Sequence, residues 1–100
     1  MSDPTQGRIN CCVPFCTRTR HNRDNTSEWI CGTHWRLVPQ HLKRRKFKLF
    51  RRYRRLFGNR SFWCFEAGSE KRIQAARLDR LCGIAWDRCK AAAIERAVGL

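Results

Sequence analysis

The feature that most constrains the fold is a pair of short cysteine-bearing stretches, CCVPFC at 11–16 and ICGTHW at 30–35. Structural zinc is held by four thiolate or imidazole groups in a tetrahedron, and two close pairs of ligands on tight turns supply that arrangement. One pair has three residues between its members, the other has two, and fourteen residues join the pairs. The sequence therefore predicts one structural zinc ion with these ligands: Cys12, Cys16, Cys31 and His34.

The ligand set has alternatives. Cys11 competes with Cys12 for the first position, and His21 and His41 are further imidazoles, each expected at the surface beside basic residues. The cysteines can instead be buried reduced thiols, which pack as small apolar residues. Disulfides are a third interpretation, which the odd total of seven cysteines disfavours.

Two helices are predicted after this module. Pro39 suits the start of the first and Gly58 its end, giving a helix over 39–57. The segment SFWCF at 61–65 is short and aromatic, typical of a strand or a packed connector. Ser69 can cap the second helix, which runs to about 97.

The second helix carries two further cysteines on its apolar face. Cys82 and Cys89 are seven residues apart, which places them about 10.5 Å apart along a helix axis. One zinc ion cannot bind both at about 2.3 Å. They are therefore predicted to be core residues.

We expect a small zinc-stabilised α+β fold that is mainly α, with a zinc-knuckle module packed on two helices, about 39–57 and 69–97. Residues 1–9 are expected to be a mobile tail. The zinc module covers 10–38, with a loop-like middle at 17–28 and a short strand at EWI, 28–30, in a treble-clef or zinc-ribbon order. Residues 39–100 form the helical part of one compact domain.

The charge is concentrated in one segment. The chain has a net charge of +14, and residues 29–65 contain eleven Lys and Arg but no Asp or Glu. Such a single-sign field attracts polyanions, and like charges four residues apart on a helix repel unless a polyanion neutralises them. The segment therefore predicts nucleic-acid binding, DNA or RNA, through one face of the first helix: Lys43, Arg44, Arg45, Phe47, Lys48, Arg51, Arg52, Arg54 and Arg55. Phe47 either stacks on an unpaired base or is covered by the zinc module.

An enzyme is not expected. A metal-dependent nuclease of the His-Asn-His type is the minor alternative, suggested by Arg20-His21-Asn22. The nearby acids are Asp24 and Glu28 only, and the helix 39–57 offers no carboxylate or Asn to hold a catalytic metal. No catalytic residue is therefore assigned.

The amino-terminal segment has no apolar core of the kind that signal peptides carry, and no apolar run approaches the ~18–20 residues that span a bilayer. These features predict a cytoplasmic protein without a membrane partner. A reducing cytoplasm also favours metal binding over disulfides for clustered cysteines.

The stretches Cys12-Val13-Pro14-Phe15-Cys16, Cys31-Gly32-Thr33-His34-Trp35 and Val38-Pro39 resemble small zinc-knuckle proteins of phages and prophages, which have no assigned activity. The resemblance covers about the first forty residues. It implies an accessory protein that acts in the cytoplasm of a bacterial host. The second functional hypothesis follows: an inhibitor or adaptor that docks its basic face on an acidic surface of a host nucleoprotein or enzyme.

Overall fold

The computed structural model describes residues 7–22 and 26–99. Within them the fold is mainly helical, with one two-stranded sheet. The chain divides into two compact units. The first contains the amino-terminal residues up to Val38 together with the chain from Lys90 onward, and the second runs from Pro39 to Cys89.

The first unit is built on a β-hairpin. Strands β1 (Arg8–Asn10) and β2 (Thr19–His21) pair antiparallel, with Ile9 opposite Arg20. Two sequence predictions are therefore wrong in part. The amino-terminal tail was expected to reach residue 9, but its last two residues belong to β1, while residues 1–6 lie outside the described range. The polar middle of the module contains a strand because its backbone completes the ladder of β1.

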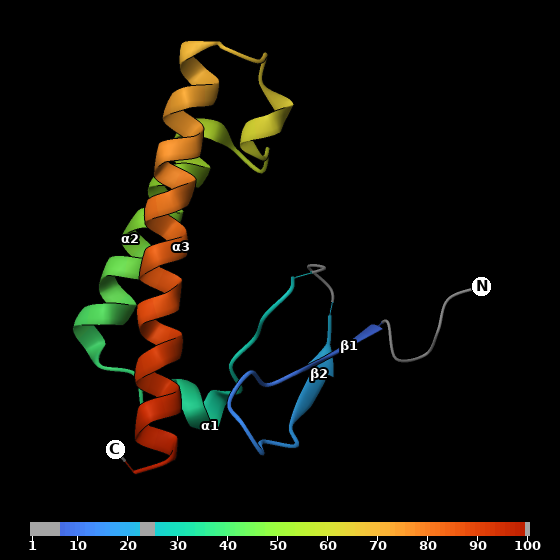
Figure 1. Ribbon diagram of the computed structural model, residues 1–100, viewed down its shortest axis with the longest axis vertical. Helices are drawn as coiled ribbons and strands as arrows, with labels where there is room; N and C mark the ends of the chain where they lie inside the picture. The colour runs from blue at the N-terminus through green and yellow to red at the C-terminus, as the bar shows by residue number, and fades with distance from the viewer. Residues whose placement is uncertain (1–6, 23–25, 100) are drawn as a thin grey trace. The chain divides into compact units, whose positions relative to one another are not determined.

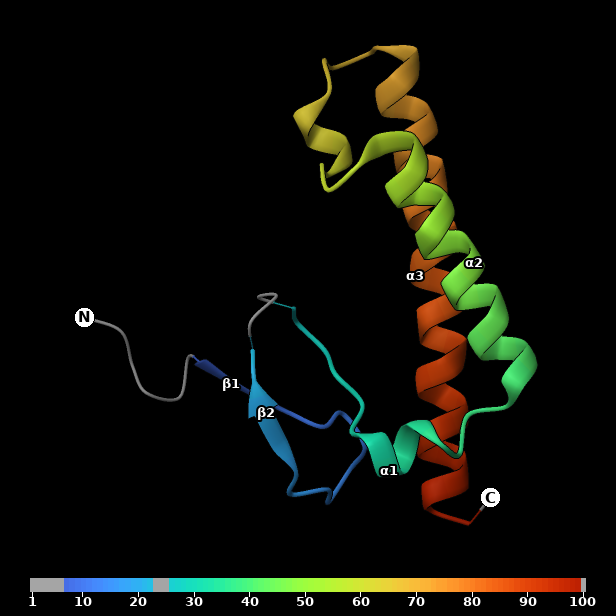
Figure 2. The same ribbon diagram turned by 180° about the vertical axis from the view of Figure 1, so that it is seen from behind.

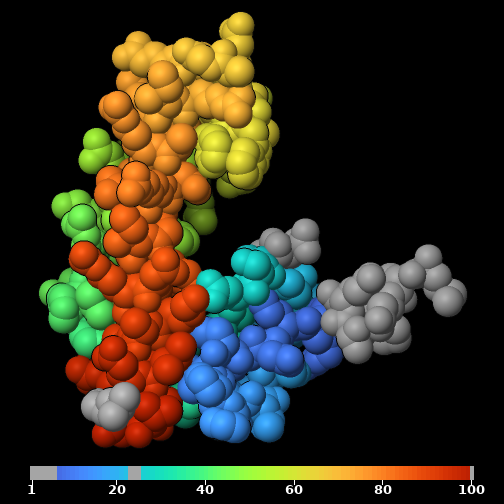
Figure 3. Space-filling model, in the orientation of Figure 1, coloured from blue at the N-terminus to red at the C-terminus, as the bar shows by residue number. Residues whose placement is uncertain are grey.

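The hairpin leads to a short helix, α1 (Gly32–Trp35). The expected strand at 28–30 does not form, although the Trp29 carbonyl accepts a hydrogen bond of 2.8 Å from the Cys12 amide. Glu28 instead pairs with Lys90, whose Nζ lies 2.6 Å from Oε2. This ion pair connects the amino-terminal residues to the last turns of α3 (Glu70–Ala97) within the same unit. In the space-filling view, the amino-terminal residues coloured blue to cyan gather into one body (Figure 3).

The second unit is a helical hairpin. Helix α2 (Gln40–Phe57) runs antiparallel to α3, and the two lie side by side in both views (Figure 1 and Figure 2). Pro39 occupies the N-cap position of α2. Gly58 ends it with φ 67°, a left-handed conformation that a side chain disfavours. The end agrees with the sequence prediction of a helix over 39–57, and the start lies one residue later than predicted.

The connection between the helices is a 3₁₀ turn. Residues 62–64 form this turn, η2 (Phe62–Cys64), where a strand or a packed connector was expected. A strand does not form because its backbone closes locally, with the Cys64 amide donating to the Ser61 carbonyl at 3.0 Å. Ser69 caps α3 as predicted, since its Oγ accepts a hydrogen bond of 3.2 Å from the Arg72 amide.

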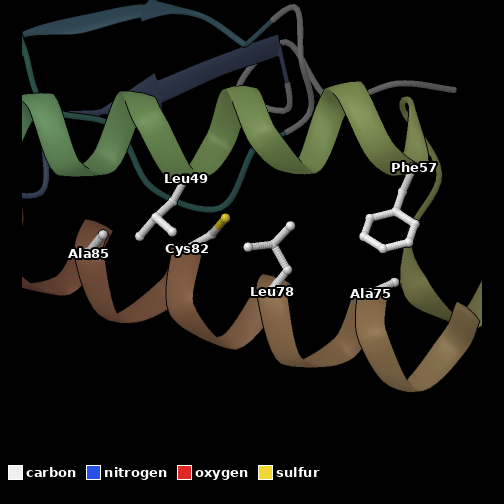
Figure 4. Packing of buried hydrophobic residues seen from close by; sticks show 6 residues of the cluster. All are labelled: Leu49, Phe57, Ala75, Leu78, Cys82 and Ala85. Carbon is white, nitrogen blue, oxygen red and sulfur yellow. The ribbon is translucent and has the colours of Figure 1, made fainter. Parts of the chain in front are cut away.

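The hairpin core follows a heptad-like stripe on α3. Ala75, Leu78, Cys82 and Ala85 are spaced three and four residues apart and face Leu49 and Phe57 of α2 (Figure 4). Tyr53, Phe62 and Phe65 pack around this cluster. Cys82 and Cys89 are buried as predicted.

Some large apolar side chains of the two helices are only partly covered. Leu56 of α2 is 50% exposed and Leu81 of α3 is 43% exposed. Each lies at the margin of its apolar arc, and two helices alone cannot cover an arc of about 120° on each other. The helical hairpin therefore leaves apolar side chains partly exposed to solvent at the edges of its core.

Candidate metal centre and basic helix

Four ligand atoms converge in the first unit. The side chains of Cys11, Cys16, Cys31 and His34 place one ligand atom each within 4.8 Å of one another. The Sγ atoms of Cys16 and Cys31 are 3.9 Å apart, and His34 Nδ1 lies 3.2 Å from Cys31 Sγ and 3.6 Å from Cys11 Sγ. The edges of a tetrahedron with bonds of about 2.3 Å to sulfur and 2.0 Å to nitrogen are about 3.5–3.8 Å long. These separations therefore fit one metal ion at the centre.

Local structure explains how the ligands meet. Cys11 directly follows β1, and Cys16 closes a turn in which its amide donates to the Val13 carbonyl at 3.1 Å. Cys31 is the N-cap of α1 and His34 lies one turn further along that helix. The hairpin thus supplies two ligands, and the start of α1, where the sequence predicted only a turn, supplies two.

The structure selects Cys11 where the sequence analysis gave Cys12 first and Cys11 as the alternative. Cys11 is 6% exposed, and its Sγ also accepts a hydrogen bond of 3.3 Å from the Cys31 amide. Its own amide donates to the Arg18 carbonyl across the hairpin at 3.0 Å, whereas the Cys12 amide donates to Trp29. Cys11 belongs to the group of converging ligand atoms and Cys12 does not.

Burial, and then the neighbouring Cys11 and Glu28, raise the pKa of the Cys12 thiol. The pKa of Cys16 is raised as well. The choice of Cys11 over Cys12 therefore rests on the convergence of the ligand atoms and not on the pKa.

Cys31 has the opposite character. Burial raises its pKa, but hydrogen bonds from the His34 backbone, from Arg18 and from the neighbouring cysteines outweigh burial and lower the pKa to about 6. The thiolate is therefore the main form at neutral pH, before any metal binds. A preformed anion beside an imidazole favours capture of a cation.

Arg18 is a member of this site that sequence reasoning missed. Its guanidinium lies 3.9 Å from Cys31 Sγ and donates a hydrogen bond to Thr33 Oγ1. It joins the hairpin to the start of α1, and its positive charge would offset that of the three thiolates around a bound ion. Its position two residues after a ligand gives no signal in a sequence that contains many arginines.

The other candidate ligands lie apart from this group. His21 is exposed on β2 and His41 is exposed on α2. All seven cysteines are free thiols. Burial raises the pKa of Cys82 and of Cys89, so both are neutral thiols in the hairpin core.

The residues that suggested a nuclease do not form a group in the described structure. Glu28 is paired with Lys90, and His21 is exposed on its strand. Asp24 lies outside the described residues.

The basic residues of α2 form a continuous exposed face. Seven of the eight predicted basic residues are exposed: Arg44, Arg45, Lys48, Arg51, Arg52, Arg54 and Arg55. Among residues 7–22 and 26–99, none of these seven forms an ion pair. Four of them line a shallow hollow with Leu56: Lys48, Arg51, Arg52 and Arg55.

Three residues of α2 differ from this pattern. Lys43 is half-buried, and Lys46 places its Nζ 4.5 Å from the ring centroid of Phe47 and 4.4 Å from that of Phe50. Burial lowers the pKa of Lys46. Phe47 is 46% exposed, so it is neither fully covered nor free of neighbouring side chains.

Comparison with known protein families, with curated proteins and with solved structures found no match. None of the helices that the structure describes is long and apolar enough to cross a lipid bilayer. The functional argument therefore rests on the Cys₃His group and on the basic face of α2.

Proposed function

We propose that this protein binds nucleic acid through the exposed basic face of α2, while one structural zinc ion on Cys11, Cys16, Cys31 and His34 holds the amino-terminal unit. The observation that supports this proposal is the row of seven exposed, unpaired cations on one helix. Phosphate groups neutralise such a row and release condensed counterions, which provides affinity without base contacts.

The geometry of the row suits a phosphate backbone. Arg44, Lys48, Arg51 and Arg55 follow one another at spacings of four, three and four residues, which places them on one ridge about 16 Å long. Arginine also forms paired hydrogen bonds with a phosphate. The zinc ion has a structural role in this proposal, because all four tetrahedral positions are taken by protein atoms and none is left for a substrate.

Salt dependence tests the proposal most directly. If the seven exposed cations meet phosphates, the logarithm of the association constant falls with the logarithm of salt concentration with a slope of about −5 for single strands and −6 for duplexes. The variant Arg44→Gln/Lys48→Gln/Arg51→Gln/Arg55→Gln should make the duplex slope less negative by about 3.6. Glutamine is chosen because it keeps helix propensity while it removes charge.

A matched control removes the same charge from α3. The variant Arg77→Gln/Arg80→Gln/Arg88→Gln/Arg96→Gln changes four exposed arginines of that helix and the same net charge. It should keep the wild-type slope. Equal losses in both variants, or a wild-type slope near zero, would overturn nucleic-acid binding by α2 and favour an acidic protein surface as the partner.

A further inference from the structure

Phe15 has an unusual backbone conformation. It lies third in the turn 13–16, in which Pro14 is second and which the hydrogen bond from the Cys16 amide to the Val13 carbonyl closes. The φ angle of Phe15 is 68°, and it is the one non-glycine residue with positive φ in the part of the chain that the structure describes. Turns of this type place glycine or asparagine here, because a bulky side chain is strained at positive φ.

The side chain of Phe15 is as unusual as its backbone. It is 100% exposed, so its ring contributes no burial to the fold. The other large exposed aromatic residues have neighbours: Trp63 lies with its ring centroid 4.2 Å from that of Phe62, and Lys46 covers Phe47. Phe15 is therefore unfavourable for folding in two independent ways, and folding alone does not explain it.

This turn adjoins the candidate metal site. Cys11 lies two residues before the turn and Cys16 is its last residue, and both belong to the Cys₃His group. A strained backbone persists only where surrounding contacts fix it, and such residues concentrate at binding sites. A metal ion bound by Cys11 and Cys16 would fix the turn that presents the Phe15 ring to solvent.

The charge around the hairpin indicates what the ring contacts. Residues 7–22 contain Arg8, Arg18 and Arg20 but no Asp or Glu. Arg20 lies over the ring of Trp29, with its Cζ 5.4 Å from the centroid. An exposed aromatic ring on a hairpin whose only charged residues are basic is suited to unpaired nucleobases, because bases stack on the ring while cations on the same segment meet the phosphates. An apolar pocket on a protein partner matches the ring but not the charge.

We propose that Phe15 is a stacking platform for an unpaired nucleobase, a second nucleic-acid contact made by the amino-terminal unit. This inference rests on the proposed nucleic-acid binding and makes it more specific. The protein then favours single strands, or duplexes with an unpaired base, because the faces of paired bases inside a continuous duplex are already stacked.

The test compares Phe15→Ala with wild type on a fluorescently labelled single strand and on a duplex of the same sequence. Alanine keeps the Cβ atom and therefore the backbone strain, so it removes the ring alone. Single-strand affinity should fall about 5- to 150-fold, the value for loss of one stacked base. The salt slope and the duplex affinity should not change, and Phe15→Trp should retain single-strand binding.

Two further measurements make the result specific. A fluorescent base analogue in the single strand should be quenched on binding wild type and not on binding Phe15→Ala. The matched control is Trp63→Ala, which removes another largely exposed ring. It should bind the single strand as wild type does, and an equal loss in both variants would overturn the assignment to Phe15.

The two proposals fail separately. If Phe15→Ala binds single strands as wild type does while the α2 glutamine variant loses affinity, the stacking role is wrong and the basic face stands. If wild type binds neither single strand nor duplex with a salt-dependent affinity, both proposals are wrong. If Phe15→Ala binds single strands as wild type does but no longer binds an acidic protein that wild type binds, the ring contacts protein and the stacking role is overturned.

Discussion

Replacement of adjacent cysteines distinguishes the metal ligands. The structure directs Cys11 Sγ to within 3.6 Å of His34 Nδ1, while Cys12 lies outside the group. Serine keeps the size of cysteine but is a far weaker zinc ligand. We therefore expect Cys11→Ser to weaken zinc binding strongly and Cys12→Ser to leave it nearly unchanged.

The magnitude follows from the number of ligands. Structural zinc sites bind with about 10–16 kcal/mol at neutral pH. Divided over four ligands, each contributes about 2.5–4 kcal/mol, which corresponds to about a 60- to 700-fold loss of affinity. Cys12→Ser should change the affinity by less than about threefold, because the hydrogen bond from Cys12 to Trp29 uses its backbone amide.

Competition with a chromophoric chelator measures both affinities. Substitution with Co²⁺ adds a count of thiolates, because each thiolate contributes to the charge-transfer absorption of the ion. Wild type and Cys12→Ser should show three thiolates and Cys11→Ser two. An equal loss in the two variants, or a larger loss in Cys12→Ser, would refute the selection of Cys11.

Three other predictions concern stability and protonation. Removal of metal with a chelator should change the tryptophan fluorescence of the unit that contains residues 7–38. Most of the far-ultraviolet helical signal should remain, because the α2–α3 core contains none of the ligands. Simultaneous loss of both signals would contradict this prediction. The pKa of Cys31 is lowered from 9.0 to about 6, so thiolate absorbance of the metal-free protein should include one group that titrates near pH 6 and is absent in Cys31→Ser. In the unfolded chain the Cys31 thiol keeps its proton up to about pH 9. The stabilisation that the Cys31 thiolate gives the metal-free protein is therefore full above pH 9 and is lost as the pH falls through 6. Chemical denaturation across this pH range measures the free energy of unfolding, and a value independent of pH would be inconsistent with a lowered pKa. Leu78→Ala should reduce the free energy of unfolding by about 2–3 kcal/mol because it leaves a cavity in the core, whereas Leu81→Ala, at a largely exposed position, should cost less than about 1 kcal/mol; similar denaturation midpoints for the two variants would show that Leu78 does not pack as described.

The helical part of the fold could be predicted closely because its signals are local. Pro39, Gly58 and Ser69 act on their own backbone neighbourhood, and each lies at a helix end in the structure. The small β-hairpin could not be predicted in the same way. Three-residue strands are too short to show an alternation of apolar and polar residues in the sequence. Strand β2 forms because its backbone pairs with that of β1.

The sequence by itself determined that Cys and His pairs occur at metal-binding spacing and that one helix carries nine Lys and Arg residues with no Asp or Glu. Only the tertiary structure decided which of two adjacent cysteines faces the group, because that choice depends on hydrogen bonds to Arg18 and Trp29, far along the chain. The same holds for Arg18 beside Cys31. The exposed Phe15 ring also depends on the fold, since its positive φ arises in the turn that the hydrogen bond from the Cys16 amide to the Val13 carbonyl closes. Composition and spacing are properties of the chain, whereas the direction of a side chain is set by contacts that only folding brings together.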